Sequence, residues 1–324
     1  MDKPKLVILD GATAIQNDLD WRIFDGVAQV SCFDRTPREK IIERAADADA
    51  VLSNKVPLFA PELNALPKLK YVGILATGYN NLDTALASQL GITATNIPAY
   101  STDSVAQLVF AHILNIANAV AAHSASAKGG GWCKAPDMTY LLTPQTELAG
   151  LTMGIVGLGA IGKKVAKIAD AFSMRVLAYS PSRRVGEKVG CAEIVSLDEL
   201  FAQSNIISLN CILNDATKNT INAQNLSKCR DGVWIINTGR GGLIDEGALA
   251  QALRSGKVGY AGLDVLSTEP PAPENPLLSA PRCFLTPHIA WATHAARARL
   301  IKIAFENFAA WLDGRPINTI ALPR

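Results

Sequence analysis

The chain has 324 residues, which is more than one ordinary hydrophobic core holds and predicts two domains. Hydrophobic residues make up 49% and charged residues 19%, a globular composition that excludes a disordered chain. The formal net charge of +2 offers no electrostatic basis for binding nucleic acid or an acidic membrane surface, so neither is an expected partner.

The first hundred residues alternate short apolar runs with segments of helical composition. Such alternation predicts a parallel sheet with helices on both faces. The predicted strands are residues 6–9, 27–33, 50–53, 71–76 and 92–95, and the predicted helices are 37–48 and 82–90.

One long helix is then predicted from Ser101 to Lys128, where three consecutive glycines end it. Its apolar stretch contains Gln107, His112, Asn115 and Asn118, so a buried helix is expected and not a membrane span. The apolar run near the N-terminus is too short for a signal peptide core, and the six cysteines are dispersed. These features predict a cytoplasmic protein with free thiols.

A second alternating series begins at Thr152 and predicts a doubly wound α/β domain. Its expected strands are residues 152–156, 175–179, 206–210, 233–237, 260–265 and 283–285. A proline-rich loop at 269–276 interrupts the series, and a last amphipathic helix is expected at 292–313.

The strongest motif is GLGAIG, a GxGxxG turn between the strand at 152–156 and the following helix. Gly157 permits the tight turn, Gly159 lets the backbone approach a pyrophosphate, and Gly162 lets helix and strand pack closely. Because a helix N-terminus also holds phosphates, this segment predicts a dinucleotide site.

The end of the next strand is where NAD-binding enzymes place the carboxylate that binds the adenosine ribose. Ser180 occupies that position here, followed by Ser182, Arg183 and Arg184. Guanidinium groups bind phosphate through paired hydrogen bonds, so these residues favour NADP(H), with NAD(H) also possible. The alternative is that both arginines are solvated loop residues and Ser180 tolerates either cofactor.

His288 is the candidate acid among the four histidines, because it follows the end of the strand at 283–285. Ligands of open α/β sheets bind at the carboxyl ends of strands, and histidine exchanges protons near neutral pH. His112 lies in the apolar helix and is expected in the core, whereas His123 and His294 fall on predicted helix surfaces.

Two further strand ends support this choice. Arg240, between Gly239 and Gly241, has room to bind a substrate carboxylate, the alternative being a pair with a structural carboxylate. Glu269 precedes the prolines that would fix its loop. Bonded to His288, it would favour the imidazolium and raise the pKa of that histidine; otherwise it is a surface residue.

Taken together, these segments resemble the D-isomer-specific 2-hydroxyacid dehydrogenase family over nearly the whole chain. The matching pieces are ATGYNN at 76–81, NIPAYSTDSVAQ at 96–107, GLGAIG at 157–162, INTGRGGLIDE at 236–246, GLDVLSTEPP at 262–271 and TPHIA at 286–290. The resemblance is greatest to the glycerate dehydrogenase group, which reduces hydroxypyruvate or glyoxylate to D-glycerate or glycolate.

The resemblance implies two flavodoxin/Rossmann-like doubly wound parallel-sheet domains with a cleft between them. A discontinuous substrate domain would comprise residues 1–100 and 289–324, and a dinucleotide-binding domain residues 101–288. It also implies a homodimer joined through the cofactor domain.

The same resemblance implies roles at matched positions. Arg240, Glu269 and His288 would be catalytic, with Thr77 and Gly78 offering N–H groups to the substrate carboxylate. Asn54 is a further candidate substrate contact and, like Lys55, is otherwise a surface residue. The implied cofactor residues are Ala160, Ile161, Cys211, Thr238, Gly239 and Asp264, the last binding the nicotinamide amide.

Two other functions stay open at this point. One is a dinucleotide-sensing protein like the corepressors that resemble this family, and the other is the same chemistry on phosphoglycerate, D-lactate or formate. No metal site is expected, because neither the cysteines nor the histidines cluster.

Overall fold

The computed structural model describes residues 3–320. The chain divides into two compact units, Met1–Ser101 with Ala292–Arg324, and Thr102–Trp291. The expected crossings between the two domains lie after residues 100 and 288, and in the structure they fall after Ser101 and Trp291.

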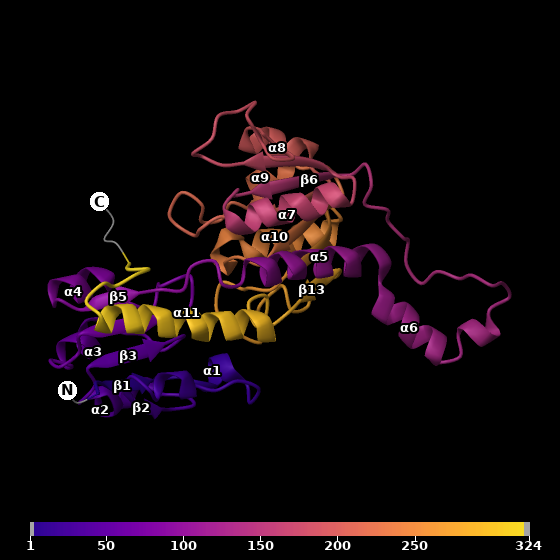
Figure 1. Ribbon diagram of the computed structural model, residues 1–324. Helices are drawn as coiled ribbons and strands as arrows, with labels where there is room; N and C mark the ends of the chain where they lie inside the picture. Colours follow the sequence, from indigo (N-terminus) through magenta and orange to yellow (C-terminus); the bar gives the residue numbers. More distant parts are fainter. Residues whose placement is uncertain (1–2, 321–324) are drawn as a thin grey trace. The chain divides into compact units, whose positions relative to one another are not determined.

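The first unit is built on a five-stranded parallel sheet in the order β2-β1-β3-β4-β5, which is the flavodoxin-like order (Figure 1). The strands are β1 (Lys5–Ile8), β2 (Gln29–Cys32), β3 (Ala50–Ser53), β4 (Tyr71–Ile74) and β5 (Thr93–Thr95). The α-helices are α1 (Ala12–Ile15), α2 (Ile41–Ala45), α3 (Ala60–Asn64), α4 (Thr84–Gln89) and α11 (His294–Leu312), with 3₁₀ turns at Arg22–Phe24 and Arg38–Lys40.

Helix α11 belongs to this unit although it lies near the end of the chain. Phe308 and Trp311 on the helix pack their rings against Tyr71 of β4. The chain therefore returns to the first sheet to complete its core.

The second unit contains an eight-stranded sheet in the order β13-β12-β11-β10-β6-β7-β9-β8, parallel except for the β8–β9 pair. From β9 to β13 this is the Rossmann order with one added strand. The strands are β6 (Thr152–Val156), β7 (Arg175–Tyr179), β8 (Lys188–Val189), β9 (Ala192–Ile194), β10 (Ile206–Leu209), β11 (Val233–Asn237), β12 (Val258–Leu263) and β13 (Cys283–Leu285).

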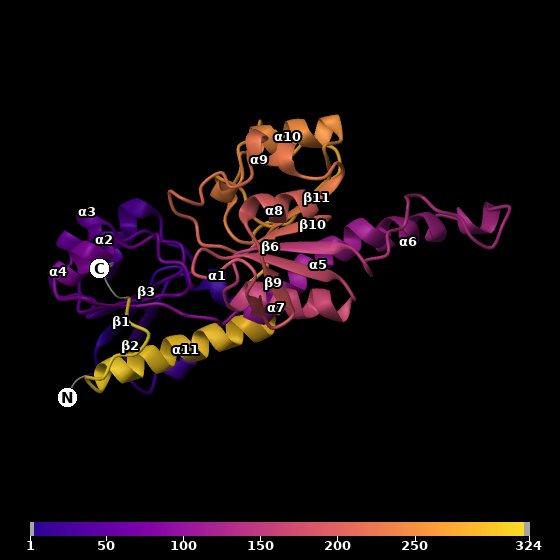
Figure 2. The ribbon, with the colours of Figure 1, turned by 90° about the horizontal axis from the view of Figure 1, so that it is seen from above.

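Helices cover both faces of this sheet (Figure 2). Helices α5 (Thr102–Asn118) and α7 (Ala160–Ala171) pack on one face, and α8 (Leu197–Gln203), α9 (Ala223–Lys228) and α10 (Glu246–Ser255) on the other. Because both faces are covered, β10 and β11 are buried at every position, which explains their mostly apolar sequences.

The prediction of one helix from Ser101 to Lys128 is wrong. It divides into α5 and α6 (Val120–Lys128), bent by 51°, with Ala119 in the left-handed region at φ 45°. The N–H of Thr146 donates to the carbonyl of Ala117, an acceptor that a continuous helix would use itself. The short β8–β9 hairpin was also not predicted.

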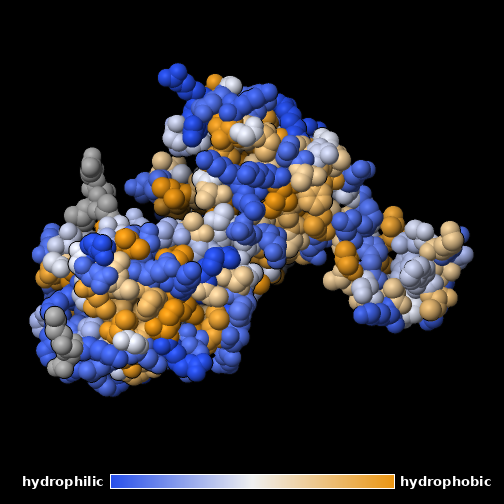
Figure 3. Space-filling view, in the orientation of Figure 1, coloured by the Kyte–Doolittle hydropathy of each residue, from blue (hydrophilic) through white to orange (hydrophobic). Residues whose placement is uncertain are grey.

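Residues 119–147 form a segment that we call the arm, and its 3₁₀ turn is Trp132–Lys134 (Figures 1 and 2). Helix α6 buries none of its residues, and the side chains of Trp132, Tyr140 and His123 make hydrogen bonds to other groups of the arm. Large apolar side chains are exposed on it (Figure 3): Val120, Trp132, Met138, Leu141 and Leu142.

Among residues 3–320, no single helix is long and apolar enough to cross a membrane. Only the bent pair α5 and α6 passes that test of length and composition, and more than half of α5 is buried inside the protein.

Candidate active site

His288 and Glu269 form a hydrogen-bonded pair at the carboxyl edge of the second sheet. The Nδ1 atom of His288 lies 2.5 Å from Oε2 of Glu269, and both side chains are about one-third exposed, at 28% and 36%. With Nδ1 bound to the carboxylate, Nε2 is the ring nitrogen left to exchange a proton with a ligand.

The backbone at His288 adopts the left-handed region, at φ 54°. Such a conformation costs about 1–3 kcal/mol in a residue other than glycine, and it persists where the surrounding structure imposes it. The N–H of His288 donates to the carbonyl of Asp264, 2.9 Å away.

The Asp264 side chain holds this loop on both sides of the histidine. Its carboxylate is 1% exposed and accepts hydrogen bonds from the hydroxyl of Thr286 at 2.6 Å, the N–H of Ile289 at 2.9 Å and the N–H of Ala290 at 2.8 Å. Asp264 therefore anchors residues 286–290, and its implied contact with the nicotinamide amide stays a prediction.

Arg240 lies in the loop that follows β11, and β11 is the neighbour of β12 in the sheet. Its guanidinium is exposed, donates to the carbonyl of Gly239, and makes no ion pair within residues 3–320. The buried Asn237 shapes this loop, because it accepts from the N–H of Gly239 and donates to the carbonyl of Arg240. The alternative that Arg240 pairs with a structural carboxylate is not observed among these residues.

The loop that carries Glu269 is fixed from two directions. Oε1 of Glu269 accepts from the N–H of Leu266 at 3.0 Å. Glu246, at the start of α10, accepts from the N–H of Ser267 and from the amide of Asn275. Glu269 is therefore no plain surface residue. The roles of Glu246 and Asn237 are not evident from the sequence, although both residues lie inside the INTGRGGLIDE segment.

The glycine-rich turn joins β6 to α7 as the motif predicts. Gly157 has φ +96°, and a Cβ on Gly162 would lie 2.1 Å from the carbonyl oxygen of Gly157. A Cβ on Gly159 would meet no atom within 4 Å, so the space before the first turn of α7 is open. That turn has no side-chain cap, which leaves the N–H groups of Ala160 and Ile161 available to an anion.

Neighbouring loops add polar groups to this edge. The hydroxyl of Thr238 and the Oδ1 atom of Asn210 are buried without a hydrogen-bond partner in the described part of the chain. Cys211 lies against the glycine turn, since a Cβ on Gly157 would approach its nitrogen to 2.6 Å. Burial raises the pKa of its thiol. Open space and unpaired polar atoms at one edge fit a bound dinucleotide.

The segment after β7 is a solvent-exposed turn. The hydroxyl of Ser180 lies 3.2 Å from that of Ser182, and no carboxylate occupies either position. Arg183 makes an ion pair with Glu187 at 2.8 Å, and the N–H of Arg184 approaches the other oxygen of Glu187. The ion pair of Arg183 with Glu187 is not evident from the sequence.

The candidate substrate residues of the first unit lie in loops after β3 and β4. The N–H groups of Thr77 and Gly78 donate to no other group within residues 3–320. Asn54 is buried, and its side chain donates to the hydroxyl of Thr13. Its loop is held by Asp10, whose carboxylate accepts the N–H groups of residues 54–56 and whose pKa burial raises.

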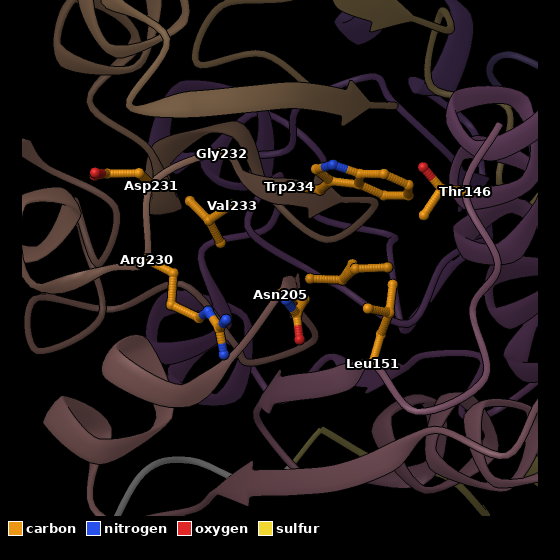
Figure 4. Close-up of a pocket in the computed structure, with 9 residues that line it drawn as sticks. Thr146, Leu151, Asn205, Arg230, Asp231, Gly232, Val233 and Trp234 are labelled. Atoms are coloured by element: carbon orange, nitrogen blue, oxygen red, sulfur yellow. The ribbon is translucent and has the colours of Figure 1, made fainter. Parts of the chain in front are cut away.

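A separate cavity of about 190 Å³ lies at the opposite, amino edge of the second sheet (Figure 4). Arg230, Asn205 and Trp234 line it, beside the starts of β10 and β11. It is therefore not part of the edge that carries His288. Within residues 3–320 no three His, Cys, Asp or Glu side chains gather as a metal site would require.

Comparison with known proteins places this geometry in context. A family model described as D-isomer specific 2-hydroxyacid dehydrogenase, NAD binding domain, matches residues 110–290. The hydroxypyruvate reductase of Blautia hydrogenotrophica is 42% identical over 319 residues, which cover 98% of this chain and 99% of that protein. The glycerate dehydrogenase of Methylorubrum extorquens is 38% identical over 284 residues, or 87% and 88% of the two chains.

Solved structures show the same fold. An NADPH-dependent glyoxylate/hydroxypyruvate reductase from Sinorhizobium meliloti, in complex with NADP and malonate, superposes with a TM-score of 0.84. The two sequences are 26% identical, and the alignment covers 99% of this chain and 97% of the other.

Proposed function

The chain belongs to the D-isomer-specific 2-hydroxyacid dehydrogenase family, and from this premise we propose that it reduces hydroxypyruvate or glyoxylate to the D-2-hydroxy acid. The observation that carries the proposal is the His288–Glu269 pair, held at the same sheet edge as the glycine turn. The names of the Blautia, Methylorubrum and Sinorhizobium relatives support these substrates.

The residues divide the chemistry between them. Bound NAD(P)H would supply the hydride to the keto carbon. The exposed guanidinium of Arg240 binds the substrate carboxylate and polarises its keto oxygen. The imidazolium of His288 gives its Nε2 proton to that oxygen and becomes neutral, while Glu269 orients the ring through its bond to Nδ1.

The available N–H groups of Thr77 and Gly78 are assigned to the substrate carboxylate as well. Asn54 is a weaker candidate, because its side chain is already bound to Thr13. For the cofactor we assign Gly157, Gly159, Ala160, Ile161 and Gly162 to the pyrophosphate. Cys211, Thr238, Gly239 and Asp264 are assigned to the remainder of the cofactor.

The first test is the initial rate with glyoxylate and with hydroxypyruvate, each with NADPH and with NADH. We expect cofactor oxidation with at least one acid, and a loss of roughly 100-fold or more in kcat for His288→Ala. His294→Ala is the matched control, because His294 is exposed and outside the site. Near-normal turnover by His288→Ala would exclude the mechanism, and no turnover on any keto acid would favour a dinucleotide-sensing protein.

We further propose a preference for NADPH, because Ser180 and Ser182 bring no carboxylate to the ribose and two guanidinium groups follow them. Arg183 would exchange its ion pair with Glu187 for the 2′-phosphate, and Arg184 would support it.

Arg183→Ala should raise KM for NADPH roughly tenfold or more and leave KM for NADH unchanged. Arg230→Ala, an exposed arginine at the opposite sheet edge, serves as control. Equal constants for both cofactors in Arg183→Ala would remove the basis for the preference.

Two properties of the whole protein complete the proposal. We propose a homodimer joined through the second unit, supported by the apolar side chains exposed on the arm. We also propose that the protein works in the reducing cytoplasm, which its six free cysteines favour.

A further inference from the structure

His112 on α5 is a buried imidazole that the proposed reaction does not use. It is 5% exposed, and burial lowers its pKa. Its ring lies against Gly262 of β12, where a Cβ would approach Cβ of His112 to 2.7 Å and Nδ1 to 3.0 Å. The strand therefore has glycine where the imidazole needs room, two residues before Asp264.

A hydrogen-bond chain leads from this imidazole to the Asp264 carboxylate. Nε2 of His112 lies 3.2 Å from the hydroxyl of Thr286. That hydroxyl has one hydrogen and donates it to Oδ1 of Asp264 at 2.6 Å, because an ionised carboxylate only accepts. Thr286 must therefore accept from His112, which requires the Nε2–H form of the ring.

The other end of the chain is the loop that carries His288. The same Asp264 carboxylate accepts the N–H groups of Ile289 and Ala290, and the Asp264 carbonyl accepts the N–H of His288. These bonds impose the left-handed backbone at His288. The hydrogen bonds among these three side chains restrict one another, so the loss of the first donor leaves Thr286 and Asp264 free to reorient.

We propose that His112 is a positioning residue that holds the His288 loop in its reactive geometry through Thr286 and Asp264. The inference rests on the proposed reductase function. His112 does not exchange a proton with the substrate; it keeps the imidazole of His288 aligned with its target. A misplacement of that ring affects the chemical step more than the binding of the cofactor.

The kinetic test compares two substitutions at one position. His112→Leu keeps an apolar volume and removes the donor, whereas His112→Gln places an amide N–H near the position of Nε2. We expect kcat to fall roughly 10–100-fold in His112→Leu with KM for NADPH unchanged, and Gln to restore most of it. His294→Leu, at an exposed position of α11, is the control. Wild-type kcat in His112→Leu, or equal losses in both variants, would overturn the inference.

Two further measurements apply even if His112→Leu does not fold. Thr286→Val removes the middle hydroxyl with little change of shape and should lose kcat to a similar extent. In the wild-type protein, ¹⁵N spectra of the four histidines should show a neutral Nε2–H ring that disappears in His112→Gln. The Nδ1–H form at His112 would contradict the hydrogen-bond chain from His112 to Asp264. If the wild type reduces no keto acid, the proposed function fails. The tautomer of His112 in the ¹⁵N spectra then still tests the hydrogen bonds from His112 to Thr286 and Asp264.

Discussion

Wholly or partly buried carboxylates organise several loops of this protein. Asp10, Asp264 and Glu246 each accept at least two hydrogen bonds, and most of these donors are backbone N–H groups of a neighbouring loop. A carboxylate accepts several donors at once, so one side chain can fix a loop that has no regular structure. In the second unit these loops are the ones that carry His288 and Glu269.

Asp18 and Arg297 provide a prediction about pH at this scale. Arg297 of α11 is 3% exposed and donates to both oxygens of Asp18 as well as to the carbonyls of Ala14 and Ile15. The bond to Arg297 lowers the pKa of Asp18 below its ordinary value of 3.8. The stabilisation is therefore present above that value and is lost as the pH falls through the lowered pKa of the folded state.

Asp18→Asn should lower the urea midpoint at pH 7, and the difference from wild type should disappear in strong acid. Asp20→Asn is the control, since the pKa of Asp20 is also lowered by an arginine, Arg22, whose side chain is 83% exposed. Such an exposed pair contributes little to stability. Equal effects of the two substitutions would contradict the role assigned to the pair of Asp18 with the buried Arg297.

At the scale of elements, the glycine turn separates folding from ligand binding. Gly162 is required by the protein itself, because its Cβ would collide with the carbonyl of Gly157. Gly159 faces open space, and no atom of the described residues lies close enough to a Cβ at this position to require glycine. The proposed pyrophosphate would occupy that space.

Gly159→Ala should keep the wild-type Tm and raise Kd for the cofactor roughly tenfold or more, because the new methyl group meets only the ligand. Gly162→Ala should lower Tm by several degrees, since α7 must shift on β6. Differential scanning fluorimetry and fluorescence titration with NADPH separate the two effects. Normal cofactor binding by Gly159→Ala would refute the assigned pyrophosphate position.

For the whole molecule, the arm is the segment least explained by the single chain. Helix α6 of the arm has no buried residue, and in the loop that follows it Met138 is 88% exposed and Leu141 is 61% exposed. Apolar side chains gathered on a projecting segment are typical of an interface between proteins.

Wild-type protein should therefore elute with about twice the mass of the 34.4 kDa chain in size-exclusion chromatography with light scattering. Met138→Glu combined with Leu141→Glu should yield the monomer, because two carboxylates would be buried at the interface. Leu278→Glu, at an exposed leucine of the same unit outside the arm, should remain dimeric. A monomeric wild type would contradict the proposed homodimer.

Features that depend on neighbouring residues could be predicted from the sequence. Hydrophobic runs located the strands of both sheets except β8 and β9, and the turns after them located Arg240, His288 and the glycine motif, because parallel strands bring their carboxyl ends to one edge. It also predicted the buried state of His112, since that residue lies in an apolar helix.

Features that depend on a partner elsewhere in the chain become visible in the folded protein. Helix α5 ends at Asn118. Near this end the carbonyl of Ala117 accepts from the N–H of Thr146, although the local sequence predicts that it accepts from the next turn of the helix. Arg183 pairs with Glu187, and Asp264 binds the loop of His288. Each outcome is a competition for a donor or an acceptor, and the competing groups come together only when the chain has folded.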